Sequence, residues 1–282
     1  MKIARFDSGH GPEIGIVTDE GLVPVGRTSP GLPADMSAII ADWDRHAPEF
    51  RRIAAEGGAL PLDPAQLLAP VARPGKILAI GLNYADHIAE SGMETPTDQV
   101  WFCKHDNAVN GPHAPIQIPR VSSMVDYEAE MVAVIGKGGR HIPAGDAPGR
   151  VFGYCVGNDV SVRDWQWKTP QWMLGKSFDT HGPFGPWITT ADEIGDPHRL
   201  GIRAIVNGDV RQNSNTRHLV FNVWDQIALL SQAMTLSPGD IIYTGTPGGV
   251  GAATKSWLRP GDVCRIEIDE LGAIEARCEA ED

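Results

Sequence analysis

One short apolar run, residues 131–135 (Met-Val-Ala-Val-Ile), constrains the fold more than any other segment of the chain. Five consecutive apolar residues that include β-branched side chains predict a strand close to the core. Two glutamates, Glu128 and Glu130, stand at the mouth of this strand. The fold must therefore build a core around the strand and also accommodate two carboxylates beside it.

Other segments of strand length are residues 77–81, 154–156, 202–206, 240–244 and 263–268. Helical patterns are fewer, at residues 36–55, 83–92 and 223–234. The chain also has 32 Gly and 22 Pro in 282 residues, which favours many turns and short strands over long helices. These observations predict an α+β fold that is mostly β.

Two prolines and a glycine in residues 68–76 mark a candidate boundary. Before it lie short alternating segments at residues 14–17 and 21–25 and the helical pattern at 36–55. We therefore predict a small N-terminal α+β accessory domain, residues 1–72, and a larger domain, residues 73–282. Residues 83–92 read as a short helix with an exposed exit at residues 93–98, a segment that could move as a lid.

A net charge of −12 without a Lys/Arg cluster argues against nucleic-acid binding. The N-terminus lacks a signal-peptide pattern, and no segment approaches the roughly 18 apolar residues of a membrane span, so we expect no membrane contact and a cytoplasmic location. The four cysteines are scattered and predict reduced, mostly buried thiols.

Glu128 and Glu130 are two positions apart, so the period of a strand puts both carboxylates on one face. Near a core such a pair needs a proton, nearby cations or a bound metal ion. A solvent-facing edge strand is the alternative reading. Asp159 follows an apolar strand in a polar turn and offers a third ligand. Three oxygen ligands favour Mg²⁺, Mn²⁺ or Ca²⁺ over zinc.

Five blocks of the chain resemble, in the same order, signatures of the fumarylacetoacetate hydrolase family. They are residues 81–90 (GLNYADHIAE), 126–130 (DYEAE), 157–166 (GNDVSVRDWQ), 175–180 (GKSFDT) and 244–251 (TGTPGGVG). The resemblance covers residues 76–275, although Val162 stands where the family more often has alanine. It implies a mixed β-sandwich roll with a small N-terminal α+β domain, a homodimer, a 2-oxo acid substrate, and Mg²⁺ or Mn²⁺, with Ca²⁺ as a possible occupant in a crystal.

The resemblance also suggests which residues carry the reaction. His87 and Glu90 are three residues apart on the predicted lid helix, so Glu90 could orient His87 and favour its protonated form. Lys176 could polarise the oxo group or stabilise an oxyanion. We therefore predict His87, Glu90 and Lys176 as catalytic residues, whereas spacing alone would equally fit an exposed histidine on a helix.

Four further residues are candidates for binding the substrate: Arg163, Gln166, Gly245 and Thr246. Arg163 and Gln166 could hold the metal-site loop or the substrate carboxylate, and a purely structural pairing of Arg163 with Asp159 or Asp164 is the alternative. The Gly-rich loop at residues 244–249 offers backbone N–H groups and hydroxyls that suit a carboxylate. Lys104 matches a family lysine near the cleft, but a surface lysine fits its sequence equally.

Two kinds of reaction fit these residues. The first is hydrolysis of a carbon–carbon bond in an acylpyruvate or 2,4-diketo acid, and the alternative is decarboxylation or tautomerisation of oxaloacetate. Both need the metal and a stabilised enolate, so the predicted ligands do not separate them. Specificity could come from Trp165, Trp167, Trp172 and Phe178, unless their bulk simply packs the core.

Overall fold

A computed structural model describes residues 1–92 and 94–282 of the chain. Its largest sheet has eleven strands, with the path β3-β2-β1-β13-β11-β10-β16-β5-β6, while β4 pairs with β1 and β7 with β13. The strands of this sheet are β1 (Lys2–Asp7), β2 (Pro12–Thr18), β3 (Gly21–Pro24), β4 (Leu67–Leu68), β5 (Ile77–Gly81), β6 (Val100–Lys104), β7 (Val109–Asn110), β10 (Ala129–Ile135), β11 (Val151–Asn158), β13 (Gly182–Thr190) and β16 (Ile241–Tyr243).

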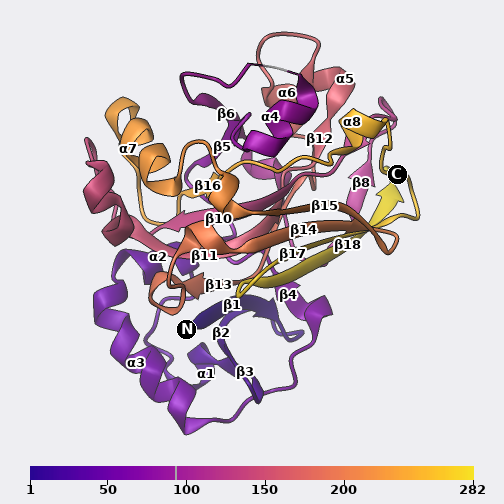
Figure 1. Ribbon diagram of the computed structural model, residues 1–282. Coiled ribbons are helices and arrows are strands. Elements are labelled where there is room, and N and C mark those ends of the chain that lie inside the picture. Colours follow the sequence, from indigo (N-terminus) through magenta and orange to yellow (C-terminus); the bar gives the residue numbers. More distant parts are fainter. Residues whose placement is uncertain (93) are drawn as a thin grey trace.

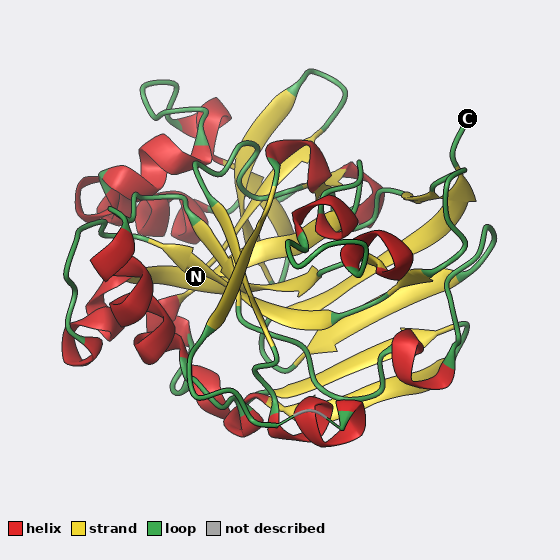
Figure 2. Cartoon of the chain, turned by 90° about the horizontal axis from the view of Figure 1, so that it is seen from above, coloured by secondary structure: helices red, strands yellow, loops and turns green. Residues whose placement is uncertain are grey.

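A second sheet of five strands has the order β15-β14-β17-β18-β8 and contacts strands β10 and β11 of the first. Its strands are β8 (Ile116–Ile118), β14 (Gly201–Val206), β15 (Asp209–Asn215), β17 (Val263–Ile268) and β18 (Gly272–Ala280). A short pair joins β9 (Val125–Asp126) to β12 (Ser161–Val162). Figure 2 shows the strands at the centre of the molecule and helices around their edges. The predicted mostly-β, sandwich-like fold is confirmed.

The helices gather at opposite ends of the strands (Figure 1). They are α1 (Val25–Thr28), α2 (Met36–Ala41), α3 (Trp43–Glu56), α4 (Ala85–Ser91), α5 (Arg163–Gln166), α6 (Met173–Lys176), α7 (Val223–Ala233) and α8 (Gly251–Thr254). Helices α1 to α3 lie with the N-terminal strands, and α4, α5, α6 and α8 lie together at the other end, at the top of Figure 1. The site described below lies among this second group.

The single helix predicted at residues 36–55 is wrong, because two helices meet at Asp42. The backbone of Asp42 (φ −121°, ψ 35°) leaves the helical region, and the residue ends α2 and begins α3. At this position the backbone N–H of Asp42 donates to the Ile40 carbonyl oxygen and ends α2. The lid prediction covers α4, and the part of its predicted exit at residue 93 lies outside the described residues.

Strand β10 is buried on both faces. Met131, Ala133 and Ile135 point into the core between the two sheets, and Val132 and Val134 point into the core shared with the N-terminal strands and helices. This strand therefore anchors its own N-terminal end, where Glu128 and Glu130 lie, between two apolar layers.

The prediction of mostly buried thiols is confirmed, because Cys155, Cys264 and Cys278 are free and buried. Cys103 is the exposed exception, since it lies in β6 at the edge of the large sheet. Strand β13 was not predicted, because the prolines at 183 and 186 argue against a strand interior. The domain division at residue 72 stays a prediction, although β1 pairs directly with β13 within one sheet. None of the helices in residues 1–92 and 94–282 is both long and apolar enough to span a membrane.

Candidate active site

Three buried carboxylates meet where β10 and β11 end side by side. The strand register pairs Ala129 with Asn158, so Asp159 lies next to Glu128, and the Asp159 N–H donates to the Glu128 carbonyl oxygen at 3.0 Å. Glu130 is the second residue of β10. One oxygen from each of the three carboxylates, Glu128, Glu130 and Asp159, lies within 4.8 Å of the others. The structure thus brings together the three residues that the sequence suggested as metal ligands.

Three buried cations surround this cluster. The Lys176 ammonium lies 2.7 Å from both Glu128 Oε2 and Asp159 Oδ2. The Lys104 ammonium lies 2.5 Å from Asp159 Oδ1 and 3.2 Å from the Val160 carbonyl oxygen. These contacts place Lys104 inside the site, so its reading as a surface lysine is wrong.

Arg163 completes the cationic group and also corrects a prediction. Its guanidinium pairs with Glu128 Oε1 at 2.7 Å and with Asp126 Oδ2 at 2.8 Å, rather than with Asp159 or Asp164. The Asp164 carboxylate instead accepts a hydrogen bond from Ser122. The Arg163 guanidinium therefore binds two carboxylates, those of Asp126 and Glu128, and holds them close together.

The carboxyl groups of Glu128 and Glu130 have pKa values that are shifted in opposite directions. Burial would raise the pKa of Glu128, but Lys176 and Arg163 outweigh it and lower that pKa to about 2. Burial, together with the negative charges of Asp159 and Glu128, raises the pKa of Glu130 well above its usual value. Burial would lower the pKa of Lys176, yet the carboxylates of Asp159 and Glu128 raise it. Lys176 is thus a firmly held ammonium, and Glu130 is the carboxyl that most needs a further positive charge.

The donor set fits a hard divalent cation. A carboxylate oxygen accepts more than one interaction, so oxygens that already bind Lys176 or Arg163 keep capacity for a metal. All three ligands are carboxylates, which suits Mg²⁺ or Mn²⁺. A cation beside Glu130 would also relieve the repulsion that raises its pKa. Glu128, Glu130 and Asp159 are therefore the residues that could hold such an ion.

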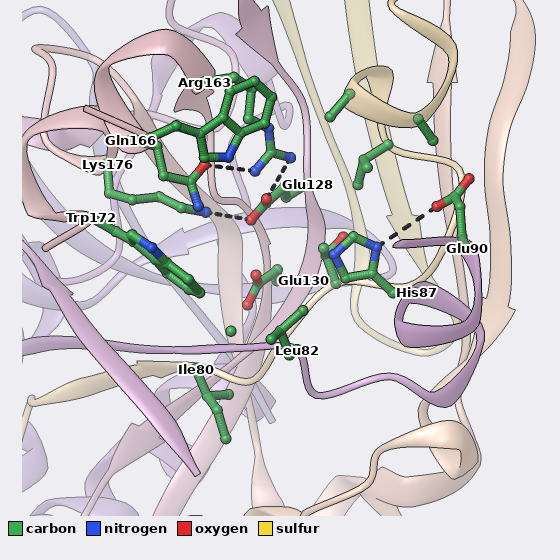
Figure 3. Close-up of a pocket in the computed structure, with 16 residues that line it drawn as sticks. Ile80, Leu82, His87, Glu90, Glu128, Glu130, Arg163, Gln166, Trp172 and Lys176 are labelled. Carbon is green, nitrogen blue, oxygen red and sulfur yellow. Dashed lines mark hydrogen bonds and ion pairs between the residues drawn. The ribbon is translucent and has the colours of Figure 1, made fainter. Parts of the chain in front are cut away.

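A cavity of about 380 Å³ opens over the carboxylates of Glu128 and Glu130, a size within the range of small-molecule sites. Its lining combines Glu128, Glu130, Arg163, Gln166, Lys176, His87, Glu90 and Thr246 with apolar residues including Ile80, Leu82, Trp167, Trp172 and Val250. Figure 3 shows Glu128 and Glu130 between Lys176 on one side and His87 on the other. The cavity is therefore charged at one end and largely apolar along its walls.

Helix α4 places the predicted dyad at the cavity. His87 Nδ1 and Glu90 Oε2 are 3.7 Å apart, an ion-pair distance that is too long for a hydrogen bond. Glu90 Oε2 also accepts the Gly249 N–H at 2.8 Å. The structure thus brings His87, Glu90 and Lys176 to one cavity, with the dyad loosely paired.

The four predicted substrate-binding residues have different surroundings. Gln166 lines the cavity and accepts a hydrogen bond from Arg163 Nη1 at 2.9 Å. Thr246 also lines the cavity. The Gly245 N–H instead donates to Glu130 Oε2 at 2.7 Å, so it holds a candidate metal ligand. Arg163, Gln166 and Thr246 face the cavity, and Gly245 lies behind it.

Two residues of the site were missed by sequence reasoning. Asp126 is fully buried and accepts hydrogen bonds from Arg163 Nε and from the N–H groups of Gly251 and Ala252. Its position two residues before Glu128, in the same acidic segment of the sequence, could have revealed it, although Asp126 ends the separate strand β9. Gln212 is also fully buried and accepts the N–H of Ala129, which lies between the two glutamates, at 2.9 Å; it comes from the other sheet, and no local pattern marks it.

The four aromatic residues considered for specificity divide into two pairs. Trp167 and Trp172 line the cavity. Trp165 and Phe178 instead pack edge to face on each other, with ring centres 5.4 Å apart, against the core between the sheets. The apolar wall of the cavity thus depends on the first pair.

Comparisons with known proteins give matches over most or all of the chain. A mitochondrial oxaloacetate tautomerase of Xenopus laevis is 44% identical over 97% of this chain and 89% of its own length, and a human one is 41% identical over 97% and 90%. The crystal structure of maleylpyruvate hydrolase from Sphingobium sp. SYK-6 with manganese(II) and pyruvate covers both chains fully, at 34% identity and a TM-score of 0.86. The model of the fumarylacetoacetate hydrolase C-terminal domain matches residues 76–279. The chain therefore belongs to the fumarylacetoacetate hydrolase family.

Proposed function

We propose that this chain is a divalent-metal-dependent enzyme that acts on 2-oxo acids and catalyses the keto–enol tautomerisation of oxaloacetate. One observation carries the proposal: two of the three clustered carboxylates, Glu128 and Glu130, line one cavity together with Lys176 and His87. The choice of reaction is supported by the relatives named as oxaloacetate tautomerases, which match nearly the whole chain. This reverses the order suggested by the sequence, which put hydrolysis first.

The charge of the site suits an anionic substrate. Four buried carboxylates, including Asp126, face the three buried cations Lys104, Arg163 and Lys176. With every group ionised the cluster carries one excess negative charge, and a divalent cation would turn this into one excess positive charge. An excess positive charge at the closed end of an apolar cavity favours binding of a carboxylate.

Tautomerisation breaks a C3–H bond, forms a C2–C3 double bond from its electron pair, and adds a proton to the C2 oxygen. A bound Mg²⁺ or Mn²⁺ would supply a Lewis acid that stabilises negative charge on that oxygen. The Lys176 ammonium would donate a hydrogen bond at the same end of the cavity. His87 would carry the C3 proton, and Glu90 would stabilise the charged imidazole. Trp167 and Trp172 would exclude water from one wall.

Hydrolysis of a carbon–carbon bond in an acylpyruvate or 2,4-diketo acid is the second candidate. It is favoured by the similarity to maleylpyruvate hydrolase and by the His87–Glu90 pair, which could activate a water molecule. Decarboxylation of oxaloacetate uses the same stabilised enolate. A cavity of about 380 Å³ leaves room for a longer acyl group.

The test uses the purified chain after treatment with EDTA, with and without added Mn²⁺ or Mg²⁺. With enol oxaloacetate, we expect metal-dependent decay of the enol absorbance without release of carbon dioxide. With acylpyruvates, hydrolysis would release pyruvate and a second acid together. Asp159→Asn should abolish the metal-dependent rate. Absence of any metal-dependent change with either class of substrate would overturn the proposal.

Two further properties stay predictions from the sequence. The homodimer can be tested by light scattering of the purified chain. A cytoplasmic location is tested by fractionation of the source cells, and the tautomerases named above are mitochondrial proteins.

A further inference from the structure

The loop after β16 uses three of its backbone N–H groups to bind three carboxylates. The hydrogen bonds run from Gly245 to Glu130 (2.7 Å), from Gly248 to Asp86 (3.3 Å) and from Gly249 to Glu90 (2.8 Å). The first carboxylate belongs to the candidate metal site, and the other two belong to helix α4, the predicted lid. One loop therefore contacts both the metal site and the lid.

The second sheet binds this loop through a side chain of β15. Gln212 Nε2, on β15, donates to Thr246 Oγ1 at 2.9 Å and to the Pro247 carbonyl oxygen at 2.7 Å. Gly249 has φ of +97°, and a Cβ there would lie 2.1 Å from the Arg211 carbonyl oxygen. The loop is thus packed on β15, and its N–H groups at Gly248 and Gly249 have a fixed direction toward the predicted lid.

Asp86, in the first turn of α4, forms hydrogen bonds with both the loop and strand β15. Its Oδ1 accepts the Gly248 N–H and the N–H of His87 at 2.8 Å. Its Oδ2 accepts the hydroxyl hydrogen of Ser214, which lies on β15, at 2.6 Å. A single carboxylate therefore joins the lid, the loop and the second sheet.

Glu90 connects this docking to the dyad. The same oxygen, Oε2, that accepts the Gly249 N–H lies 3.7 Å from His87 Nδ1. Because Asp86 is the residue directly before His87, a shift of the first turn would move the imidazole as well. The position of the proton carrier in the cavity then depends on contacts made outside the cavity.

We propose that Asp86 and Ser214 are positioning residues that hold the lid against the loop, so that His87 and Glu90 are kept in place for proton transfer. This inference rests on the proposed function, in which His87 moves a proton. Neither Asp86 nor Ser214 lines the cavity, so both act through the dyad rather than on the substrate.

Four variants test this role: Asp86→Ala, Ser214→Ala, Ser214→Thr and, as a matched control, Ser122→Ala. Ser122 donates to Asp164 at 2.6 Å, the same kind of bond with the same length as that from Ser214 to Asp86. We expect Asp86→Ala and Ser214→Ala to lower kcat at least about ten-fold, the effect of losing a hydrogen bond to a charged group. Ser214→Thr keeps the hydroxyl and should therefore retain the kcat of the parent chain. Ser122→Ala should also leave kcat unchanged.

Two readouts separate positioning from a general loss of structure. Mn²⁺ affinity should stay within about two-fold of the parent value, because the three candidate ligands are untouched. Backbone amide exchange in α4 (Ala85–Ser91) should accelerate at least about ten-fold in Asp86→Ala and Ser214→Ala, without a matching change in β10. Equal acceleration in α4 and β10 would indicate global destabilisation and overturn the inference.

The exchange experiment also keeps the two proposals apart. If the parent chain turns over none of the 2-oxo acids, the proposed function fails, but faster exchange in α4 alone would still support the docking role. If the chain is active and Asp86→Ala changes neither kcat nor exchange in α4, the docking role fails while the proposed function stands.

Discussion

Lys104 is a buried charge whose stability depends on its pairing with a candidate metal ligand, Asp159. Its side chain and that of Asp159 are both fully buried, and the pair is closed by the Val160 carbonyl oxygen. Removing one partner of such a pair leaves the other charge without compensation, which costs several kcal/mol. An exposed pair, such as Lys137 with Asp44, contributes little because water screens both charges.

We therefore expect Lys104→Met to lower the free energy of unfolding by about 3 kcal/mol in metal-free protein. The matched control Lys137→Met should change it by less than about 1 kcal/mol. Urea denaturation followed by fluorescence measures both values. Similar small losses in the two variants would contradict the burial of this charge.

His181 gives a pH dependence whose sign follows from its surroundings. Its ring is fully buried, and Nε2 donates to the Gln117 carbonyl oxygen at 2.7 Å. Burial lowers the pKa of His181 to about 4; nearby Lys104 also lowers it, and Asp159 and Asp179 oppose the change. In the unfolded chain the pKa is about 6.5. Between these values the unfolded chain binds a proton that the folded chain does not, so stability falls as the pH falls.

The full contribution of His181 is present above about pH 6.5 and is lost by about pH 4, a difference of about 3 kcal/mol. Between about pH 6.5 and pH 4, the free energy of unfolding should fall in both proteins. We expect the fall in the parent chain to exceed the fall in His181→Gln by about 3 kcal/mol. Urea denaturation at several pH values gives the comparison. Parallel curves for the two proteins would show that His181 does not titrate in this way.

At the scale of elements, the site depends on two short helices in close contact. A Cβ at Gly175 in α6 would lie 2.3 Å from the backbone nitrogen of Gln166 in α5. A backbone nitrogen cannot move aside as the end of a flexible side chain can. A methyl group at Gly175 must therefore push α5 and α6 apart. Lys176 follows Gly175 directly, and its ammonium would leave Glu128 and Asp159.

Gly175→Ala should therefore lower kcat by about ten- to one-hundred-fold, because small displacements of a catalytic group are costly. Overpacking should also lower the free energy of unfolding by about 1–3 kcal/mol. The control Gly145→Ala has open space around the new methyl group and should change stability by less than about 0.5 kcal/mol. An active, fully stable Gly175→Ala protein would show that the helices can move apart.

Sequence patterns predicted those parts of the site that depend on local periodicity. The two-residue spacing of Glu128 and Glu130 brings their carboxylates together at the start of β10, although Glu128 lies just before the strand, and the lid helix carries its own pattern. Lys104 and Gln212 reach the site from elements far away in the sequence, so their burial left no local signal. Strand β13 was hidden because its prolines argue against a strand, whereas in the folded chain the backbone around them still pairs with β11 and β7.

At the scale of the whole molecule, the N-terminal segment belongs to the same sheet as the site. Strand β1 pairs with β13 through Lys2 with Thr189 and Ile3 with Ile188. One apolar cluster includes Ile3 from β1 together with Val132 and Val134 from β10. These pairings join residues about 130 or more positions apart, so the sequence could suggest an accessory segment but not its place in the sheet.

This continuity predicts that residues 73–282 do not fold cooperatively alone. Deleting residues 1–72 would expose one edge of β13 and one face of β10, and unpaired strands with exposed apolar faces aggregate. In the full chain, Ile3→Ala should lower the free energy of unfolding by about 2–5 kcal/mol, because Ile3 is fully buried. Removing only residues 281–282, both exposed, is the matched control and should change little. Circular dichroism and urea unfolding of the shortened chain decide the matter: a sharp transition with metal-dependent activity would establish residues 73–282 as an independent domain.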